Sequence, residues 1–174
     1  YFANKIVKLF LDPTAPKTTI DTFFLNEKNR AASVSSNEGI FIQKMSFDGD
    51  GHLTQSMNYE KGNFVGKSVL KWSEGNLIRN TTYDAKGKVL SDLNYSYYSD
   101  KPNTISQINM GTGFTGTDSK NLIKQSIGIA SIVSSSDTMI PNYKYQFNND
   151  GAVKLKVVYD RASNLIDSIA YAYY

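Results

Sequence analysis

The sequence predicts an all-β protein, an antiparallel meander of about a dozen short-turn strands that forms a closed or half-closed barrel-like sheet. Three observations predict this fold class. An aromatic residue followed by a glycine turn recurs about every twelve residues, the segments between turns alternate apolar and polar side chains, and 12 Tyr and 9 Phe stand among 174 residues. Aromatic residues favour strands, and a sheet of this many strands usually curls or splits. The length fits one β domain over residues 1–174.

Six copies of a short repeat occur along the chain. Each copy begins with an aromatic residue, continues through a polar turn and ends at the apolar residue that opens the next strand. Such self-similarity at a nearly constant spacing indicates a repeated structural unit. The copies are FDGDGHL (Phe47–Leu53), YEKGNF (Tyr59–Phe64), WSEGNL (Trp72–Leu77), YDAKGKV (Tyr83–Val89), FNNDGAV (Phe147–Val153) and YDRASNL (Tyr159–Leu165).

Each copy is expected to be a hairpin turn between two strands. An Asp, Asn or Glu opens the turn by bonding the backbone that follows, and a glycine, or Asn or Ser in the last copy, takes the position with positive φ. In SFDGDGHLTQ, Asp48 and Asp50 also match the start of a calcium loop. That hypothesis fails because the chain runs through His52 directly into a strand, without the further oxygen ligands and the closing glutamate that calcium requires.

The segments between the turns alternate with the period of two that a strand requires. In KVLSDLNYSYY the apolar and aromatic residues share one face and the polar residues share the other, and AVKLKVVYD and IFIQKMSF behave in the same way. This pattern predicts a sheet with one buried and one solvated face. Three further strands are expected at Lys5–Leu11, Ile20–Asn26 and Thr104–Met110.

Two segments interrupt the rhythm. Residues 11–19 contain two prolines and are predicted to be a loop. Residues 111–142 are predicted to be an irregular insertion, within which a helical spacing (Ile123, Ile127, Ala130) competes with a strand spacing (Ile127, Ile129, Val133). The β-branched residues favour extended chain. GTGFTG at the start of this insertion is interpreted as a flexible loop rather than a phosphate-binding one, because no strand-then-helix setting surrounds it.

The copies YDAKGKV and YDRASNL resemble the tyrosine–aspartate repeats of Rhs-type surface and toxin-shell proteins. GTDSKNL (Gly116–Leu122) and YKYQFNNDG (Tyr143–Gly151) are similar to segments of a family of Bacteroidetes secreted or lipid-anchored proteins, a domain of unknown function with a porin-like fold. The resemblance covers most of the chain from about Ile40 onward. It implies export to the periplasm or to the outer membrane, where the protein would be held as a lipoprotein, and no known catalysis. Because the chain starts at Tyr1 rather than Met, we expect the lipid anchor upstream.

Composition excludes several kinds of chemistry. Without cysteine there is no disulfide, thiolate nucleophile or Cys-ligated metal, and the single histidine provides neither a zinc pair nor a Ser–His–acid triad. His52 is expected on the solvent face with Thr54 and Ser56. The net charge is +3 with scattered lysines, so no nucleic-acid partner is expected. No cofactor and no bound metal are expected.

The tyrosines are the best functional indication. Several lie on the predicted core-facing side of strands, where they either fill the core or form a concave aromatic surface for a ligand. Asp167 shares a face with apolar and aromatic residues, so it is the one acid that could lie inside a barrel lumen. The candidate ligand-binding residues are Tyr95, Tyr97, Tyr143, Tyr145, Asp167, Tyr171 and Tyr173.

These observations predict a non-enzymatic binding or structural module of the cell envelope. Its partner would be a glycan, a peptide or another envelope protein, and it would reach the membrane only through the upstream lipid anchor. The alternative is a hydrolase with a lumenal carboxylate at Asp167, which would need a second acid nearby. A transmembrane β-barrel fits less well, because the turns are uniformly short and lysines recur on one face of successive strands.

Overall fold

The computed structural model describes residues 4–10, 19–36, 39–105, 113–130 and 138–172, and most of them lie in β-strands. No helix in these described ranges is long and apolar enough to cross a membrane. A 3₁₀ helix, η2, spans Gly113–Thr115. The strands are β1 (Lys5–Phe10), β2 (Thr19–Leu25), β3 (Ala31–Ser36), β4 (Phe41–Phe47), β5 (Leu53–Glu60), β6 (Asn63–Ser73), β7 (Asn76–Asp84), β8 (Val89–Pro102), β9 (Asn121–Ala130), β10 (Thr138–Met139), β11 (Asn142–Phe147), β12 (Val153–Tyr159) and β13 (Leu165–Ala170).

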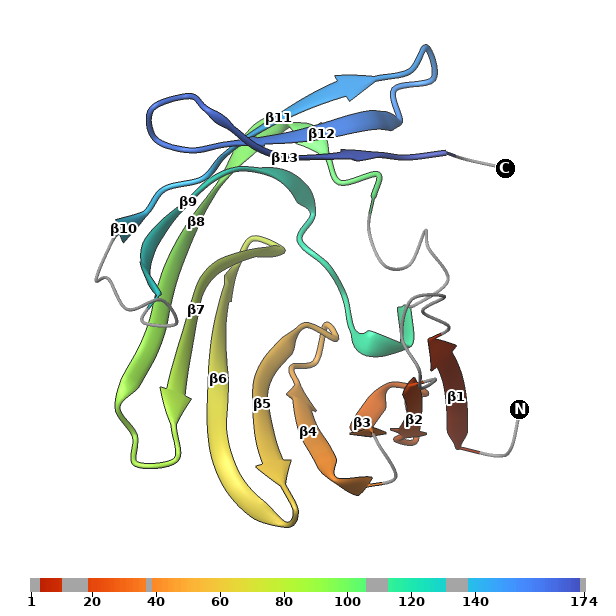
Figure 1. The fold of residues 1–174 in the computed structure, drawn as a ribbon. Coiled ribbons are helices and arrows are strands. Elements are labelled where there is room, and N and C mark those ends of the chain that lie inside the picture. Colours follow the sequence, from red (N-terminus) through yellow and green to blue (C-terminus); the bar gives the residue numbers. More distant parts are fainter. Residues whose placement is uncertain (1–3, 11–18, 37–38, 106–112, 131–137, 173–174) are drawn as a thin grey trace.

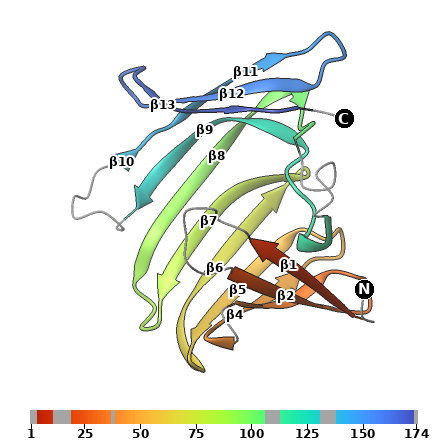
Figure 2. The same ribbon diagram turned by 45° about the vertical axis from the view of Figure 1, so that its right-hand side comes forward.

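The strands form one antiparallel meander. Their order in the sheet follows the sequence from β1 to β9 and then through β11 and β12 to β13, with β10 pairing β9 off this path. The sheet curls into an open half-barrel whose two ends, β1 and β13, do not pair (Figure 1). A view turned by 45° shows the same continuous curve (Figure 2). The predicted all-β meander with a half-closed sheet is therefore confirmed.

Four copies of the repeat form the same hairpin turn. In the copy after β4, the Asp48 carbonyl accepts from the Gly51 amide at 3.2 Å, and the Asp48 amide donates to the His52 carbonyl at 3.0 Å. The copies that begin at Tyr83, Phe147 and Tyr159 repeat both hydrogen bonds. In every case the opening Asp or Asn side chain accepts a backbone amide four residues on. The turn that the sequence predicted is confirmed in these copies.

Positive φ occurs where the repeat predicts it. Gly51, Gly87 and Gly151 have φ of 91°, 84° and 79°, and Ser163 holds the equivalent place in the last copy with φ of 68°. The two shorter copies have positive φ at both central residues, Lys61–Gly62 and Glu74–Gly75. That pair of conformations defines the type I′ turn, whose twist matches the twist of a hairpin.

A β-bulge accompanies each turn. The register shifts next to the aromatic residue of every copy, as at Ser46/Phe47 between β4 and β5 and at Thr82/Tyr83 between β7 and β8. A bulge adds one residue to one strand, which bends that strand and increases its right-handed twist. Because the bulges recur along the sheet, their bends accumulate, and this accounts for a sheet that curls.

The structure contains one more copy of the turn than the sequence analysis found. Between β2 and β3, the Asn26 amide donates to the Arg30 carbonyl at 2.8 Å, and the Asn26 side chain accepts from the Lys28 and Arg30 amides. Asn29 takes the positive-φ place, with φ of 56°. This copy escaped notice because Leu25 replaces the aromatic residue and no glycine follows.

The region expected to be irregular continues the meander. Residues 121–130 form β9, a full strand paired with β8, so the extended interpretation of this segment is confirmed and the helical one is wrong. The predicted strand Thr104–Met110 is a turn at its first two residues, and its other residues lie outside the described ranges. The proline-containing loop at 11–19 also lies outside them, apart from Thr19, which opens β2.

The two faces of the sheet differ in character. The convex face carries lysines that lie over tyrosine rings, with Lys44 5.0 Å from the centre of the Tyr59 ring and Lys67 5.5 Å from that of Tyr83. Because a single curled sheet has no second layer, few side chains in the described ranges are fully enclosed. The buried apolar residues are Ala31, Leu122 and Val153.

Exchanging the residues at the positive-φ place should change stability in opposite directions. Ser163→Gly should raise the free energy of unfolding by about 1 kcal/mol, because an L side chain is strained in the left-handed region. Gly151→Ser, at the same place in another copy, should lower it by about the same amount. Urea unfolding measures both, and Gly49→Ala, which has open space for its Cβ, is the control with little change. Equal stability of all four proteins would contradict this account of the turn.

Candidate ligand-binding site

A segment inside the curve of the sheet converts its open concave face into a cavity. This segment, residues 113–120, is here called the strap; it contains η2 and leads into β9 (Figures 1 and 2). The Thr117 amide donates to the Gly51 carbonyl at 2.9 Å in the turn after β4. The Lys120 amide donates to the Gly75 carbonyl at 2.8 Å in the turn after β6. The strap is therefore held to two turns that are distant in sequence.

Ser119 joins the strap to two strands of the sheet. Its Oγ accepts from the Leu77 amide at 3.0 Å and lies 2.9 Å from the Tyr97 hydroxyl. The Ser119 carbonyl accepts from the Asn103 side chain at 3.0 Å. Just beyond the strap, Asn121 and Asn76 exchange further hydrogen bonds. The strap is thus bound to β7 and β8 as well as to the turns.

The described part of GTGFTG is packed rather than free. The Phe114 ring meets the Phe23 ring edge-on, with the ring centres 5.0 Å apart. Gly116 has φ of 123°, and a Cβ at that position would lie 2.9 Å from the Phe47 ring. Gly116 therefore allows the backbone to approach an aromatic side chain closely, and Gly113–Thr115 forms the 3₁₀ helix η2.

The cavity between the strap and the sheet has a volume of about 450 Å³. Aromatic and aliphatic side chains from β5 to β13 form its wall, and amide and hydroxyl groups from the strap and its neighbours add polar groups. Small-molecule sites usually have this composition, a mostly apolar wall with a small number of polar groups that point into the cavity. The lining includes Trp72, Tyr97, Tyr145 and Lys156 on the sheet, Tyr171 just after β13, and Asn103, Thr117, Asp118, Ser119 and Asn121 on or beside the strap.

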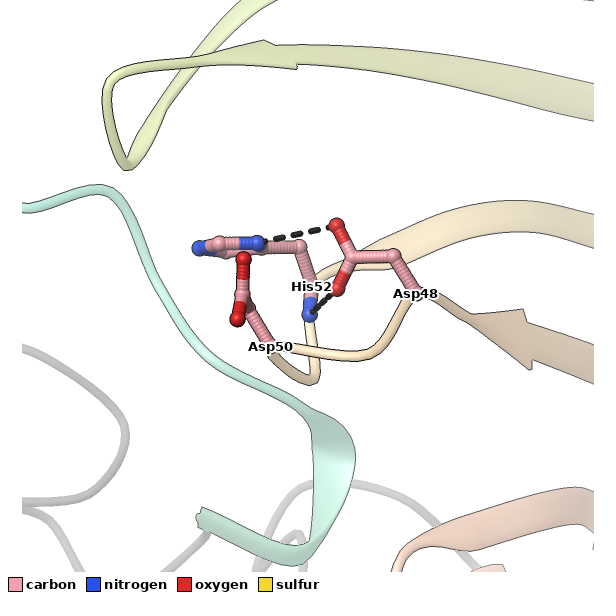
Figure 3. Close-up of side chains that lie close together, drawn as sticks. All are labelled: Asp48, Asp50 and His52. Carbon is pink, nitrogen blue, oxygen red and sulfur yellow. Dashed lines mark hydrogen bonds and ion pairs between the residues drawn. The ribbon is translucent and has the colours of Figure 1, made fainter.

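Trp72 is held in a single orientation at the cavity wall. Its indole Nε1 donates to the Leu53 carbonyl at 2.8 Å. The His52 ring stacks on it, with the ring centres 4.4 Å apart and the planes inclined by 25°. His52 Nδ1 in turn lies 3.0 Å from Asp48 Oδ2 (Figure 3). The contacts thus run in series from Asp48 to His52 and from His52 to Trp72, which lines the cavity.

The expectation that His52 faces solvent is wrong. Its exposed fraction is 8%, and Ser56, expected beside it, is also buried at 5%. The bulge at Ser46/Phe47 breaks the simple alternation of sides at the start of β5, so counting by twos from the turn assigns the wrong face. The imidazole acts here as a packing partner of Trp72.

Asp48, Asp50 and His52 form a compact polar cluster in this turn. One potential ligand atom from each of the three lies within 4.8 Å of the others (Figure 3). Both carboxylate oxygens of Asp48 are used inside the turn, one by the His52 amide and one by the His52 ring. Burial opposes ionisation of Asp48, but the hydrogen bonds from His52 outweigh it and hold the pKa of that carboxyl below its ordinary value. The cluster is therefore explained by the structure of the turn.

The predicted tyrosines are partly gathered at the cavity. Tyr97, Tyr145 and Tyr171 line it. Tyr143 lies on β11 two residues from Tyr145, with its hydroxyl 3.3 Å from Ser126 Oγ, and Tyr95 is half-buried on β8. Tyr173 lies outside the described residues. The sequence pattern thus predicted three of the residues that line the cavity.

Burial keeps these phenols protonated. It raises the pKa of Tyr97 to about 12, although hydrogen bonds with Ser119 and Leu77 act in the opposite direction. Burial is also the main reason that the pKa of Tyr145 is raised, and repulsion from the neighbouring tyrosines adds to it. Burial raises the pKa of Tyr95 as well. Near neutral pH these tyrosines are therefore neutral hydroxyls that can both donate and accept hydrogen bonds.

Asp167 does not line the cavity. It lies on β13 opposite Val158, and the side chains of that strand are exposed. Its Oδ1 accepts from the Ser168 amide at 2.7 Å. Because β13 is the edge of an open sheet rather than a strand of a closed barrel, the carboxylate faces solvent.

Sequence reasoning missed the strap, Trp72 and Lys156 as parts of the site. The sequence analysis treated Trp72 only as the aromatic residue of a repeat. The fact that it is the single tryptophan of the chain could have marked it as a candidate site residue. Lys156 resembled the other strand lysines, and nothing local distinguishes it from Lys154. The cavity depends on hydrogen bonds between the strap and turns up to 67 residues away, such as Thr117 Oγ1 to the Asp50 carbonyl, which no local pattern shows.

No protein-family model matches the chain, and no curated protein matches it. Among solved structures it is similar to a porin-like protein from Bacteroides uniformis, with 16% identity over 95% of this chain and 76% of the other and a TM-score of 0.65. It is also similar to a porin-like protein from Bacteroides vulgatus, with 13% identity, 97% and 87% coverage and a TM-score of 0.57. These likenesses confirm a porin-like fold of the type found in Bacteroides, while the kinship with tyrosine–aspartate repeats stays a prediction.

Ser119→Ala should loosen the strap. It leaves the buried Leu77 amide and the Tyr97 hydroxyl without this partner, so the free energy of unfolding should fall by about 1–3 kcal/mol. Urea unfolding gives the size of the change. Ser99→Ala is the matched control, because Ser99 is exposed and only its carbonyl is used by Asn121. A Ser119 variant as stable as the Ser99 variant would show that these bonds do not secure the strap.

Asp48→Asn should lower the free energy of unfolding more at neutral pH than in acid. The folded-state pKa of Asp48 lies below its ordinary value, so the ionised carboxylate stabilises the fold above the unfolded-state pKa. This contribution is lost as the pH falls through the folded-state pKa. The difference in free energy of unfolding from wild type should therefore shrink below about pH 4. Urea unfolding at about pH 7, 5 and 3 measures it, with the exposed Asp50→Asn as control. A difference that is independent of pH would contradict the role of the charge.

Proposed function

We propose that the protein is a non-enzymatic protein of the bacterial envelope that binds a glycan in the cavity under the strap. The observation that carries this proposal is a set of aromatic rings that line one cavity together with amide and hydroxyl groups: Trp72, Tyr97 and Tyr145 from three strands, and Tyr171 just after β13. Aromatic faces pack against the C–H faces of sugar rings, and amides and neutral phenols can bond the sugar hydroxyls.

The polar groups of the cavity favour a sugar over a purely apolar ligand. Asn103, Thr117, Ser119 and Asn121 contribute amide and hydroxyl groups to the side of the cavity nearest the strap. Several of these groups bond to one another within the protein, and a hydroxyl or amide oxygen has a second lone pair with which it can also accept from a sugar hydroxyl. A peptide remains the second candidate ligand, because β13 is an open sheet edge that could pair with an extended strand.

The hydrolase alternative has less support. Glycoside hydrolysis uses two carboxyl groups that flank the scissile bond. Among the described residues that line the cavity the one acid is Asp118, and Asp167 lies outside it on the exposed edge strand. Binding without cleavage accounts for the arrangement of groups better than catalysis does.

An envelope location is part of the same proposal. It is supported by the resemblance to secreted and lipid-anchored proteins and by the fold shared with porin-like proteins from two Bacteroides species. We infer that the protein is held in the periplasm or at the outer membrane as a lipoprotein. Membrane contact would then come through a lipid anchor upstream of this chain.

A glycan array followed by titration calorimetry tests the function. At least one oligosaccharide should bind, and Trp72→Ala should weaken that binding by about tenfold or more, because aromatic residues at the centre of a site contribute most. Tyr83→Ala is the matched control, since Tyr83 lies under Lys67 away from the cavity. Failure of every glycan to bind, or equal losses in the two variants, would refute the proposal.

A further inference from the structure

Lys156 is placed unlike the other lysines of the sheet. It lies on β12 opposite Tyr145 of β11 and Ile169 of β13, and it lines the cavity together with Tyr145 and Tyr171. Its side chain is half-buried, with Nζ 5.0 Å from the centre of the Tyr143 ring. Among the described residues that line the cavity, it is the only cation.

Lys144 provides a comparison within the same hairpin. It lies over the Tyr159 ring at 5.0 Å, which is the same distance as for Lys156 and Tyr143. Lys144 is exposed and does not line the cavity, because neighbouring strand positions of opposite parity point to opposite faces. The two lysines have the same local aromatic contact, and of the two only Lys156 lines the cavity.

The charge of Lys156 is incompletely compensated within the protein. Burial lowers the pKa of its ammonium group, and Asp167 on the neighbouring strand opposes that effect only in part. Asp118, the other acid at the cavity, is not among the groups that raise the pKa of Lys156. An ammonium that has lost part of its hydration is stabilised by a negative charge, so a ligand anion would complete its environment.

We propose that Lys156 is the anion-binding group of the cavity and that the glycan carries a carboxylate on a sugar ring, as uronic acids do. This inference rests on the proposed glycan-binding function and names its ligand class. The Lys156 ammonium bonds the carboxylate, and the neutral hydroxyl of Tyr145, which lies opposite Lys156 on β11, adds a donor beside it. A charge-assisted hydrogen bond is about twice as strong as a neutral one, so the carboxylate is the group that the site selects.

Paired ligands that differ only in charge test the inference. The probes are trimers of galacturonate, mannuronate and glucuronate, their methyl esters, and neutral trimers of the same hexoses. Calorimetry is carried out with the wild-type protein, Lys156→Met, Lys156→Arg and Lys144→Met. At least one uronate trimer should bind the wild type about tenfold or more tightly than its methyl ester. Lys156→Met should abolish that preference, Lys156→Arg should keep part of it and Lys144→Met should keep all of it.

The outcomes separate the two proposals. Neutral trimers or methyl esters that bind as tightly as the uronates would overturn the carboxylate inference and leave glycan binding in place. Absence of binding by every trimer would overturn the carboxylate inference, and failure of every glycan on the array as well would overturn the proposed function. A preference for uronates that survives Lys156→Met but is lost in Lys144→Met would place the anion on the convex face and refute the role of Lys156. Near-ultraviolet circular dichroism and the melting temperature show whether each variant is folded.

Discussion

The structure depends on one recurrent interaction, the hydrogen bond from an Asp or Asn side chain to the backbone amide four residues on. This bond closes the turn, places a residue with positive φ three positions after the acid or amide, and is accompanied by a β-bulge at the preceding aromatic. Each bulge bends its strand in the same sense. Repetition of the bend along one sheet produces a concave face without any second layer to shape it.

In a single curled sheet, the open concave face exposes apolar and aromatic side chains to water. The strap reduces this exposure because it crosses the concave face. It is hydrogen-bonded to the β4–β5 and β6–β7 turns and to strands β7 and β8. Its attachment relies on backbone carbonyls at the turns, which the hairpins leave free for outside donors. The cavity is therefore enclosed by the same turns that bend the sheet.

The turn after β4 links the fold to the site more directly than the others. Asp48 closes the turn as its equivalents do, and in addition it bonds the ring of His52, which stacks on Trp72. A position that is an arginine, a lysine, an alanine or an asparagine in the other long turns (Arg30, Lys88, Ala152, Asn164) is here a histidine. A variation on the repeat has thus produced an oriented aromatic platform, which is the preorganisation that a binding site requires.

The sequence by itself determined the fold class, the place of most strands and the chemistry of the turns, because these depend on residues within about a dozen positions of one another. It also predicted Tyr97, Tyr145 and Tyr171, since alternation assigns a strand residue to a face. It misplaced His52 because a bulge interrupts that alternation, and it left open whether Asp167 lies in a lumen because it could not show whether the sheet closes. The tertiary structure alone decided the position of the strap, the orientation of Trp72 and the difference between Lys156 and Lys144. Those features arise from contacts between segments far apart in the chain, where no local periodicity carries information.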